Sequence, residues 1–340
     1  MHRRLGAVTA VTAISALSFG LAACSSASGS APQGSGSGAP ASTIKLAGVA
    51  AFAQDPYWIS LMCGGTREAK AEGVQIRWYA ANNTDTAAAQ QNFQAATLTK
   101  PAGVIIGSFD PGTFATQTQT LMQKGTPVIS VDGPMSPSTE LKQIDSNTNV
   151  TAFANLIASQ VGDTGSFAVL GGAPAIPQAE ARWTPVVAAV RAKNPHIKIL
   201  ATQYDGFDRN KAAQNTAALI VAHPDLAAVY AIAGPEGEGA AAAVKQAGKA
   251  GKIKVYAYDA TPGEVADLKS GDIVALLSQP AGGEGAQSVK YLVHFLKSFK
   301  GGPVTPQTPL EQSLPLMVLT KENVDSPAAQ PYLYKATCDA

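Results

Sequence analysis

Short apolar runs alternate with longer segments in which apolar residues recur at helical spacing, from Ile44 to about residue 299. The runs are continuous instead of alternating with polar residues, which is typical of strands in a parallel sheet that is buried on both faces. The predicted strands are residues 44–52, 74–81, 103–108, 127–133, 166–172, 197–203, 226–234, 252–260 and 272–279. This alternation predicts an α/β fold of repeated strand-helix-strand units.

The strand-helix pattern occurs twice, over residues 44–133 and 166–260. About 300 residues follow Thr43, which suits two lobes better than one small core. We therefore predict two doubly wound parallel-sheet lobes with a cleft between them. The carboxyl ends of the strands border such a cleft, and α/β proteins bind ligands there.

Polar side chains stand where several predicted strands end. Asp132, Asp259 and Gln279 close three strands, and Asp55 follows the first strand just before Pro56. A carboxylate at the tip of an apolar strand needs a reason. Each Asp has an ordinary alternative role as the N-cap of the next helix, but several polar groups converging at strand ends favour a ligand site.

Tyr57 and Trp58 stand side by side at the turn between the first strand and its helix. Aromatic residues make up only 6% of the chain, so an adjacent pair at this turn is notable. The pair either packs in the core or offers a stacking surface to a ligand, and its place at a strand end favours stacking.

Near the start of the chain, Arg3 and Arg4 are followed by an apolar stretch and then by Leu-Ala-Ala-Cys at 21–24. This arrangement predicts a lipoprotein signal peptide over residues 1–23, with lipidation of Cys24; the alternative is a chance cysteine behind an ordinary cleavage site. Residues 24–42 are Ser, Gly, Ala and Pro with few other types, which predicts a flexible tether. We expect the protein on the outer face of the cytoplasmic membrane.

The net charge of +1 offers no basic surface for nucleic acid. Of three cysteines, Cys63 and Cys338 remain once Cys24 is lipidated. A disulfide is the default for two cysteines in an oxidising compartment, so we predict that these two pair. Two free thiols, with Cys63 buried on its helix, are the alternative.

A glycine turn at Gly237 and Gly239, with Asp259 about twenty residues on, has the outline of a dinucleotide-binding fingerprint. Glu236 and Glu238 argue against it, because their carboxylates would repel a pyrophosphate. The four histidines lack ligand spacing and no Cys-x-x-Cys is present, so neither a metal nor a cofactor is expected. Binding is therefore favoured over catalysis, and a nucleotide-dependent oxidoreductase is the enzyme alternative.

Four motifs in order resemble the ribose-type sugar-binding proteins of bacterial ABC importers, which have the type I periplasmic binding fold. The motifs are the Asp-Pro-Tyr-Trp turn at 55–58, PVISVDG at 127–133, the Phe-Asp-Arg turn and helix from Phe207, and VYAYDATPGEVADLKSGDIVALLSQ at 255–279. The resemblance runs from about Ile44 to Phe299.

The resemblance implies that Tyr57 and Trp58 sandwich a sugar ring and that Phe207 closes its other face. It implies that the sugar hydroxyls are bound by Asp55, Asp132, Arg182, Asp259 and Gln279. The chain departs from the relatives at two places, with Gly133 in place of an Arg and Ala233 to Glu236 in place of an Asn-Asp pair. Ser108, Asp110 and Glu236 are candidates to compensate.

The resemblance also implies a hinge of three strand crossings, near 133–147, near 279 and after 302. The predicted first lobe is 43–133 plus about 280–302, the second is 148–278 plus part of 303–325, and the tail 326–340 packs on the first lobe through Cys338. The implied function is capture of a small sugar or polyol for an ABC permease by a monomeric protein. A ligand-capturing partner of a membrane receptor is the alternative within the same fold.

Overall fold

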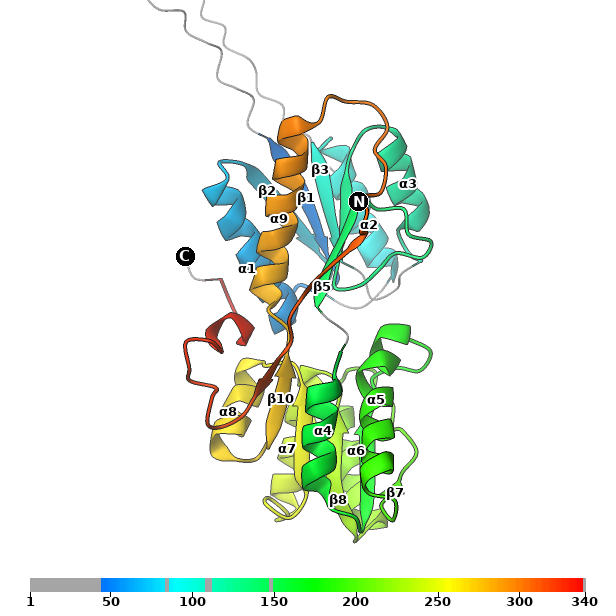
Figure 1. Ribbon diagram of the computed structural model, residues 1–340, viewed down its shortest axis with the longest axis vertical. Helices are drawn as coiled ribbons and strands as arrows, with labels where there is room; N and C mark the ends of the chain where they lie inside the picture. The colour runs from blue at the N-terminus through cyan, green and yellow to red at the C-terminus, as the bar shows by residue number, and fades with distance from the viewer. Residues whose placement is uncertain (1–43, 83–85, 108–111, 147–148, 339–340) are drawn as a thin grey trace, which may run out of the picture. The chain divides into compact units, whose positions relative to one another are not determined.

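Two sheets, each with helices on both faces, form two lobes in the computed structural model (Figure 1). The structure describes residues 44–82, 86–107, 112–146 and 149–338. The expected signal peptide, the tether, Cys24, Ser108 and Asp110 lie outside these residues.

The first sheet is entirely parallel, with strand order β2-β1-β3-β4-β5-β11. Its strands are β1 Lys45–Ala50, β2 Gln75–Ala80, β3 Gly103–Gly107, β4 Val128–Val131, β5 Lys142–Ser146 and β11 Glu311–Leu314. Helices α1 Pro56–Ala71 and α9 Ala281–Ser298 cover one face, and α2 Thr86–Leu98 and α3 Ala115–Gln123 cover the other. Along β1, Leu46 packs with the first helix pair and Ala47 with the second, which explains the continuous apolar run.

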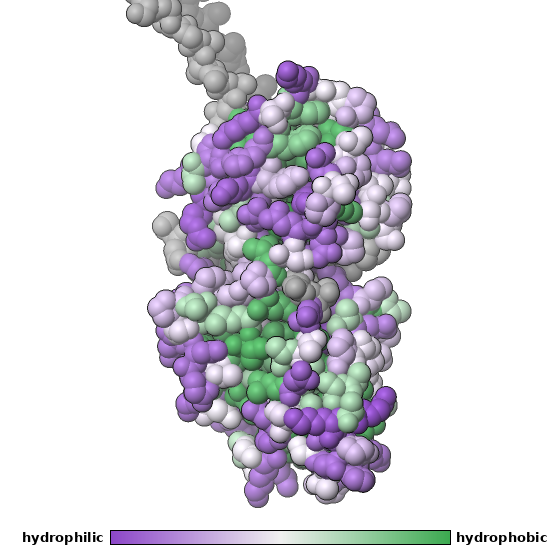
Figure 2. All heavy atoms as spheres, in the orientation of Figure 1, coloured by the Kyte–Doolittle hydropathy of each residue, from purple (hydrophilic) through white to green (hydrophobic). Residues whose placement is uncertain are grey.

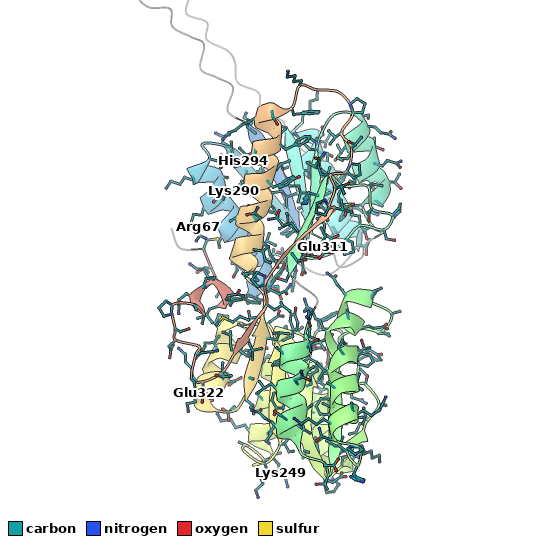
Figure 3. All side chains as sticks on the ribbon, in the orientation of Figure 1. Arg67, Lys249, Lys290, His294, Glu311 and Glu322 are labelled. Carbon is teal, nitrogen blue, oxygen red and sulfur yellow. A yellow bond between two sulfur atoms is a disulfide. The ribbon has the colours of Figure 1, made fainter. Side chains whose placement is uncertain are left out.

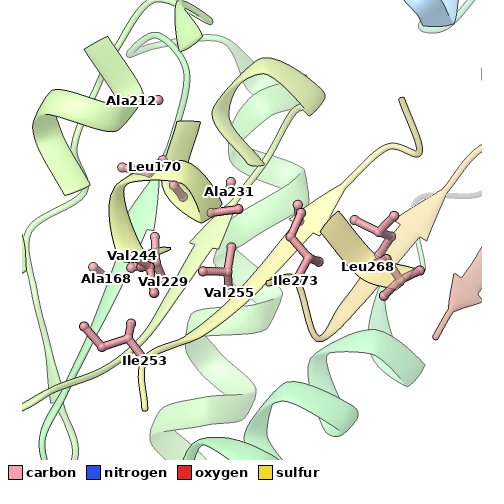
Figure 4. Packing of buried hydrophobic residues seen from close by; sticks show 14 of the residues in the cluster. Ala168, Leu170, Ala212, Val229, Ala231, Val244, Ile253, Val255, Leu268 and Ile273 are labelled. Atoms are coloured by element: carbon pink, nitrogen blue, oxygen red, sulfur yellow. The ribbon is translucent and has the colours of Figure 1, made fainter. Parts of the chain in front are cut away.

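The second sheet has strand order β7-β6-β8-β9-β10-β12, and only β12 runs antiparallel to its neighbour. Its strands are β6 Ser166–Leu170, β7 Lys198–Ile199, β8 Leu226–Ala231, β9 Lys254–Tyr258, β10 Ala275–Ser278 and β12 Met317–Leu319. Its helices are α4 Thr151–Val161, α5 Pro177–Lys193, α6 Arg209–Ala222, α7 Gly234–Gln246 and α8 Pro262–Ser270. The core beneath α6, α7 and α8 is shown in Figure 4.

All nine predicted strands are present, and the predicted fold class is confirmed. The pattern missed β5, β11 and β12. Strand β5 escaped because it is polar yet buried: its Lys142, Gln143 and Asp145 bond to other protein groups. Hydropathy alone does not reveal such a strand.

Counted over the described strands and helices, the chain passes between the sheets three times: between β5 and α4, between β10 and α9, and between β11 and β12. The first sheet therefore extends to Ser146, one strand beyond the predicted boundary at 133. Within 303–325, β11 joins the first sheet and β12 the second.

Helices α1 and α9 lie side by side, and glycines let them approach closely (Figure 1). A side chain on Gly64 would overlap the backbone of Gly282, and one on Gly285 would overlap the backbone of Leu61. The glycine pair that follows Cys63 is therefore explained by helix packing. Figure 3 shows side chains of the same two helices, Arg67 on α1 and Lys290 and His294 on α9.

The C-terminal tail, residues 320–338, contacts both lobes and not only the first. Cys338 forms a disulfide with Cys63 on α1, with 5.4 Å between their Cα atoms. Val324 and Ala329 instead pack into the core of the second lobe. A short 3-10 helix, η1 Gln330–Tyr332, lies between these two attachments.

Polar and charged side chains cover most of the first lobe on the face shown in Figure 2, and apolar side chains gather on the second lobe near β10. Within the residues that the structure describes, no helix is long and apolar enough to cross a membrane.

Candidate ligand-binding cleft

A cavity of about 320 Å³ lies at the carboxyl ends of strands from both sheets. Its size is within the range of small-molecule sites. It is lined by Phe52, Asp55, Tyr57, Trp58, Asn82, Asp132, Arg182, Gly206, Phe207, Asp208, Ala233, Pro235 and Asp259. The structure thus brings seven of the eight principal predicted site residues together around one cavity, and the eighth, Gln279, is hydrogen-bonded to Asp132 and Arg182.

Asp55 is both a helix cap and a wall of the cavity. It is the N-cap of α1, where its Oδ1 accepts hydrogen bonds from the main-chain N–H of Tyr57 at 2.9 Å and of Trp58 at 3.4 Å. Pro56 at the first helical position suits this start. The cap and the ligand-contact interpretations of Asp55 are therefore compatible.

Tyr57 and Trp58 do not form parallel plates. Their rings are perpendicular, at 89° with 5.1 Å between centroids, so the predicted sandwich of a sugar between these two rings does not fit the geometry. Only 5% of Tyr57 and 2% of Trp58 is exposed, and both belong to the core of the first lobe. The pair lines the cavity as part of that core.

Two phenylalanines complete the apolar surface of the cavity, one from each lobe. Phe52 follows β1, and Phe207 lies in a turn of the second lobe with a φ of +61°. The carboxylate of Asp205 holds this turn by accepting the N–H of Phe207 at 2.9 Å. Aromatic side chains from both lobes therefore border the same space.

Asp132, Arg182 and Gln279 form a polar network across the lobes. The Gln279 side chain donates to Asp132 Oδ1 at 3.1 Å and accepts from Arg182 Nη2 at 3.2 Å. Arg182 Nη2 lies 4.0 Å from Asp132 Oδ1. Asp132 stands at the end of β4 with a φ of +58°, a conformation that Asp tolerates better than most residues.

Arg182 is the one cationic side chain among the described residues of the cavity wall, and contacts outside the polar network also hold it in place. Nη1 donates to the carbonyl of Ile232 at 3.1 Å, and the guanidinium lies 4.1 Å from the centre of the Tyr258 ring. Burial opposes the charge, but Tyr258, Asp259 and Asp132 outweigh it and raise the pKa of Arg182 above its ordinary value. Arg182 therefore stays charged.

Asp259 ends β9 with a φ of +89° and is 8% exposed. Its Oδ2 accepts from the N–H of Gly234 at 3.1 Å, and its Oδ1 accepts from the hydroxyl of Tyr334 at 3.1 Å. Burial raises the pKa of Asp259, although Arg182 acts in the opposite direction. Burial followed by repulsion from Asp259 raises the pKa of Asp55 to about 7.

Among the described residues, the cavity wall therefore carries four carboxyl groups, those of Asp55, Asp132, Asp208 and Asp259, and one guanidinium, that of Arg182. Carboxylates are hydrogen-bond acceptors, and a protonated Asp55 can also donate. Such a wall suits a neutral ligand rich in hydroxyl groups, which both donate and accept.

The glycine turn does not serve a phosphate. The carboxylate of Asp259 occupies the N-terminus of α7, where a pyrophosphate would bind. Gly237 packs against the side chain of Glu264 and Gly239 against the backbone of Arg209. These glycines allow helices to approach one another, which argues against the nucleotide alternative.

Glu236 does not line the cavity, contrary to the prediction that it contacts ligand. It is fully buried and accepts from the N–H groups of Gly172 at 2.7 Å and Ile232 at 3.1 Å. Burial, followed by its neighbour Asp205, raises the pKa of Glu236 well above its ordinary value. Glu236 therefore supports the loops beside Phe207.

Comparison with known proteins identifies the family to which this architecture belongs. Residues 47–300 match the periplasmic binding protein domain. The chain belongs to that family.

Relatives within this family carry sugar or polyol names. The D-allose-binding periplasmic protein of Escherichia coli (strain K12) is 25% identical over 264 residues, 74% of this chain and 84% of that protein. The xylitol-binding protein of Mycolicibacterium smegmatis is 25% identical over 271 residues, 78% of this chain and 74% of that protein. An ABC transporter solute-binding protein from Agrobacterium vitis, solved with alpha-D-tagatopyranose, is 26% identical with a TM-score of 0.74, covering 86% of this chain and 100% of that one.

Sequence reasoning missed Phe52, Asn82 and Asp208 in the cavity wall. A signal existed for the first two, because Phe52 and Asn82 follow β1 and β2 as Asp132 follows β4. No local signal identified Gln178, at the start of α5, whose side-chain amide donates to the main-chain carbonyl of Asp132. Its partner lies on the other lobe, 46 residues away in sequence.

This contact explains why position 133 is a glycine. A side chain on Gly133 would overlap the amide of Gln178, and Gly133 has a φ of +139°, which favours glycine. Beyond Asp132 and Arg182, a second cavity of about 330 Å³ is bordered by Gly133, Gln178 and Gln279. At this position the chain therefore leaves space, and the amide of Gln178 lies beside it.

Proposed function

We propose that the protein is the extracytoplasmic solute-binding subunit of an ABC importer and that it captures a small sugar or polyol in the cavity between its lobes. The observation that carries this proposal is the combination of aromatic side chains from both lobes with the network of Asp132, Arg182 and Gln279. The names of the family relatives support the same class of ligand.

The chemistry of the wall explains how such a ligand is held. A sugar ring has faces of C–H bonds, which pack on the rings of Phe52 and Phe207, while its hydroxyls point to polar groups. Asp55, Asp132 and Asp259 accept hydrogen bonds from hydroxyls, and Arg182 donates. Unpaired hydroxyls in a dry site would cost roughly 1–3 kcal/mol each, so this pairing sets specificity.

The three chain crossings between the sheets act as a hinge. The ligand contacts both lobes, so it favours the closed arrangement by its differential affinity for that form. The permease then recognises the closed protein. At the N-terminus, removal of residues 1–23 and lipidation of Cys24 would anchor a monomer to the membrane through the tether 24–42.

A thermal-unfolding screen tests the proposal. The chain from residue 43 is unfolded with D-ribose, D-allose, D-tagatose, xylitol or NAD, because a ligand at about 1,000 times its Kd adds roughly 4 kcal/mol to the folded state. We expect a rise in Tm with at least one sugar or polyol, and its loss in Asp132→Ala. The surface variant Asp325→Ala is the control. A rise with NAD alone, or with none of the four carbohydrates, would refute the proposal.

A further inference from the structure

Tyr334, in the C-terminal tail, reaches the ligand site from behind. Its side chain is 5% exposed and packs in the core of the first lobe, with its ring edge-on to Tyr57 at 5.7 Å between centroids. Its hydroxyl donates to Asp259 Oδ1 at 3.1 Å and accepts from the N–H of Gln279 at 3.4 Å. One side chain of the tail therefore contacts three groups at or beside the cavity.

The backbone on both sides of Tyr334 is held in place. The N–H of Tyr334 donates to the carbonyl of Ala260 at 2.9 Å on the second lobe, and the N–H of Lys335 donates to Ser60 Oγ at 2.7 Å on the first. The disulfide between Cys338 and Cys63 lies three residues further on. Because both lobes fix this segment, the Tyr334 hydroxyl has little freedom to leave Asp259.

We propose that Tyr334 is a positioning residue of the ligand site, which orients the carboxylate of Asp259 toward the ligand hydroxyls. The inference rests on the proposed sugar or polyol binding. Among the described residues, each oxygen of Asp259 has one donor, the Gly234 N–H on Oδ2 and the Tyr334 hydroxyl on Oδ1. A carboxylate has about four acceptor sites, so each oxygen keeps capacity for a ligand hydroxyl while its direction is fixed.

The Tyr334 hydroxyl also favours the ionised form of Asp259. Burial raises the pKa of Asp259, and the hydrogen bond from Tyr334 is one of the contacts that lower it. Loss of the hydroxyl would leave a buried oxygen without its donor and favour the protonated acid. A protonated Asp259 is a poorer acceptor for a ligand hydroxyl.

The test compares Tyr334→Phe with Tyr332→Phe. The first keeps the ring and removes the hydroxyl. The second removes a hydroxyl from the same tail, where Tyr332 bonds to Ser278 through its main-chain carbonyl. Carbon-13 NMR of aspartate carboxyl groups, assigned with Asp259→Asn, measures the pKa of Asp259 without ligand. Calorimetry measures the Kd for D-ribose, D-allose, D-tagatose and xylitol.

We expect Tyr334→Phe to raise the pKa of Asp259 and to weaken binding of whichever solute binds by about tenfold, the scale of one hydrogen bond to a charged group. Tyr332→Phe should change neither. In the background of Asp259→Asn, Tyr334→Phe should have little further effect on Kd, since it acts through that carboxylate.

Three results would overturn the positioning role: an unchanged pKa of Asp259, an equal effect of Tyr332→Phe, or full additivity with Asp259→Asn. Failure of all four solutes to bind the unaltered protein would instead refute the proposed ligand class. The NMR measurement then still decides whether Tyr334 controls Asp259, so the two failures are distinguishable.

Discussion

The side-chain amide of Gln178 on the second lobe donates to the main-chain carbonyl of Asp132 on the first. The contact needs the space left by Gly133, where a side chain would overlap the amide. Asp132 also accepts a hydrogen bond from Gln279 and lies near Arg182. The contact with Gln178 therefore joins the lobes at the polar network of these three residues.

Gln178→Ala should weaken ligand binding by about fivefold, because one net hydrogen bond of about 1 kcal/mol between the lobes is lost. Calorimetry with the sugar or polyol that stabilises the protein most measures this effect. Glu180→Ala, an exposed position on the same helix, is the matched control. Equal Kd values for Gln178→Ala and the control would show that the contact does not contribute to binding.

Gly133→Ala should be more damaging than Gln178→Ala. It introduces overlap with Gln178 and places a side chain at a φ of +139°. In the background of Gln178→Ala the overlap disappears but the backbone strain remains, so part of the lost affinity should return. No recovery of affinity in the double variant would mean that strain alone accounts for the effect.

The fold was largely predictable because a strand that is buried on both faces of its sheet has a continuous run of apolar residues. Val104 and Ile105 pack against helices on opposite faces of the first sheet, so β3 is a continuous apolar run. Strand β5 was not predictable from hydropathy, because its Gln143 and Asp145 are polar residues that are buried and hydrogen-bonded to each other.

Some residues of the candidate site could likewise be predicted from the sequence, and others could not. The sequence could predict that Asp132 and Asp259 line the cavity, because strand ends in doubly wound sheets converge. Gln178 and Tyr334 were not found, because each acts through a partner on a distant segment: a carbonyl in one case, and a carboxylate 75 residues away in the other. Tertiary contacts of this kind leave no local pattern. The perpendicular arrangement of the Tyr57 and Trp58 rings also could not be predicted from the sequence.

Phe207→Ala should weaken binding by about 2 kcal/mol, roughly a 30-fold rise in Kd, because the ring offers an apolar face to the ligand. Tyr204→Ala is the control, since Tyr204 is a neighbouring aromatic that is 44% exposed and not part of the cavity wall. Calorimetry on both variants measures the difference. A similar loss in the two variants would argue against stacking on Phe207.

Asp55 should make stability fall as pH rises. In the folded protein its pKa is raised to about 7, from 3.8 for an ordinary Asp, chiefly by burial. Between these values the folded state holds a proton that the unfolded chain has lost. The contribution to stability is therefore complete below pH 3.8 and is lost as pH rises through about 7.

Asp55→Asn should remove this pH dependence while keeping an oxygen acceptor for the helix cap. We expect it to raise the free energy of unfolding relative to the unaltered protein at pH 8, by up to about 4 kcal/mol, and much less at pH 4. Asp55→Ala also loses the cap, at about 1 kcal/mol. Urea unfolding at the two pH values measures these differences. An equal change in the free energy of unfolding for Asp55→Asn at pH 4 and pH 8 would contradict the assignment of the raised pKa to Asp55.

The disulfide between Cys63 and Cys338 closes a loop with a sequence separation of 275 residues. Replacing both cysteines with serine should lower the free energy of unfolding by up to about 5 kcal/mol, because the unfolded chain regains the freedom of a long loop. Urea unfolding of the two proteins, each with and without dithiothreitol, measures the loss; the reductant should affect only the protein that retains its cysteines.

Ligand affinity should fall less than stability does in the serine variant. Tyr334 remains held by Ala260, and Lys335 by Ser60, without the disulfide. The variant should therefore bind ligand more tightly than Tyr334→Phe does. If it binds as weakly as Tyr334→Phe, the covalent link and not these hydrogen bonds holds Tyr334 at Asp259.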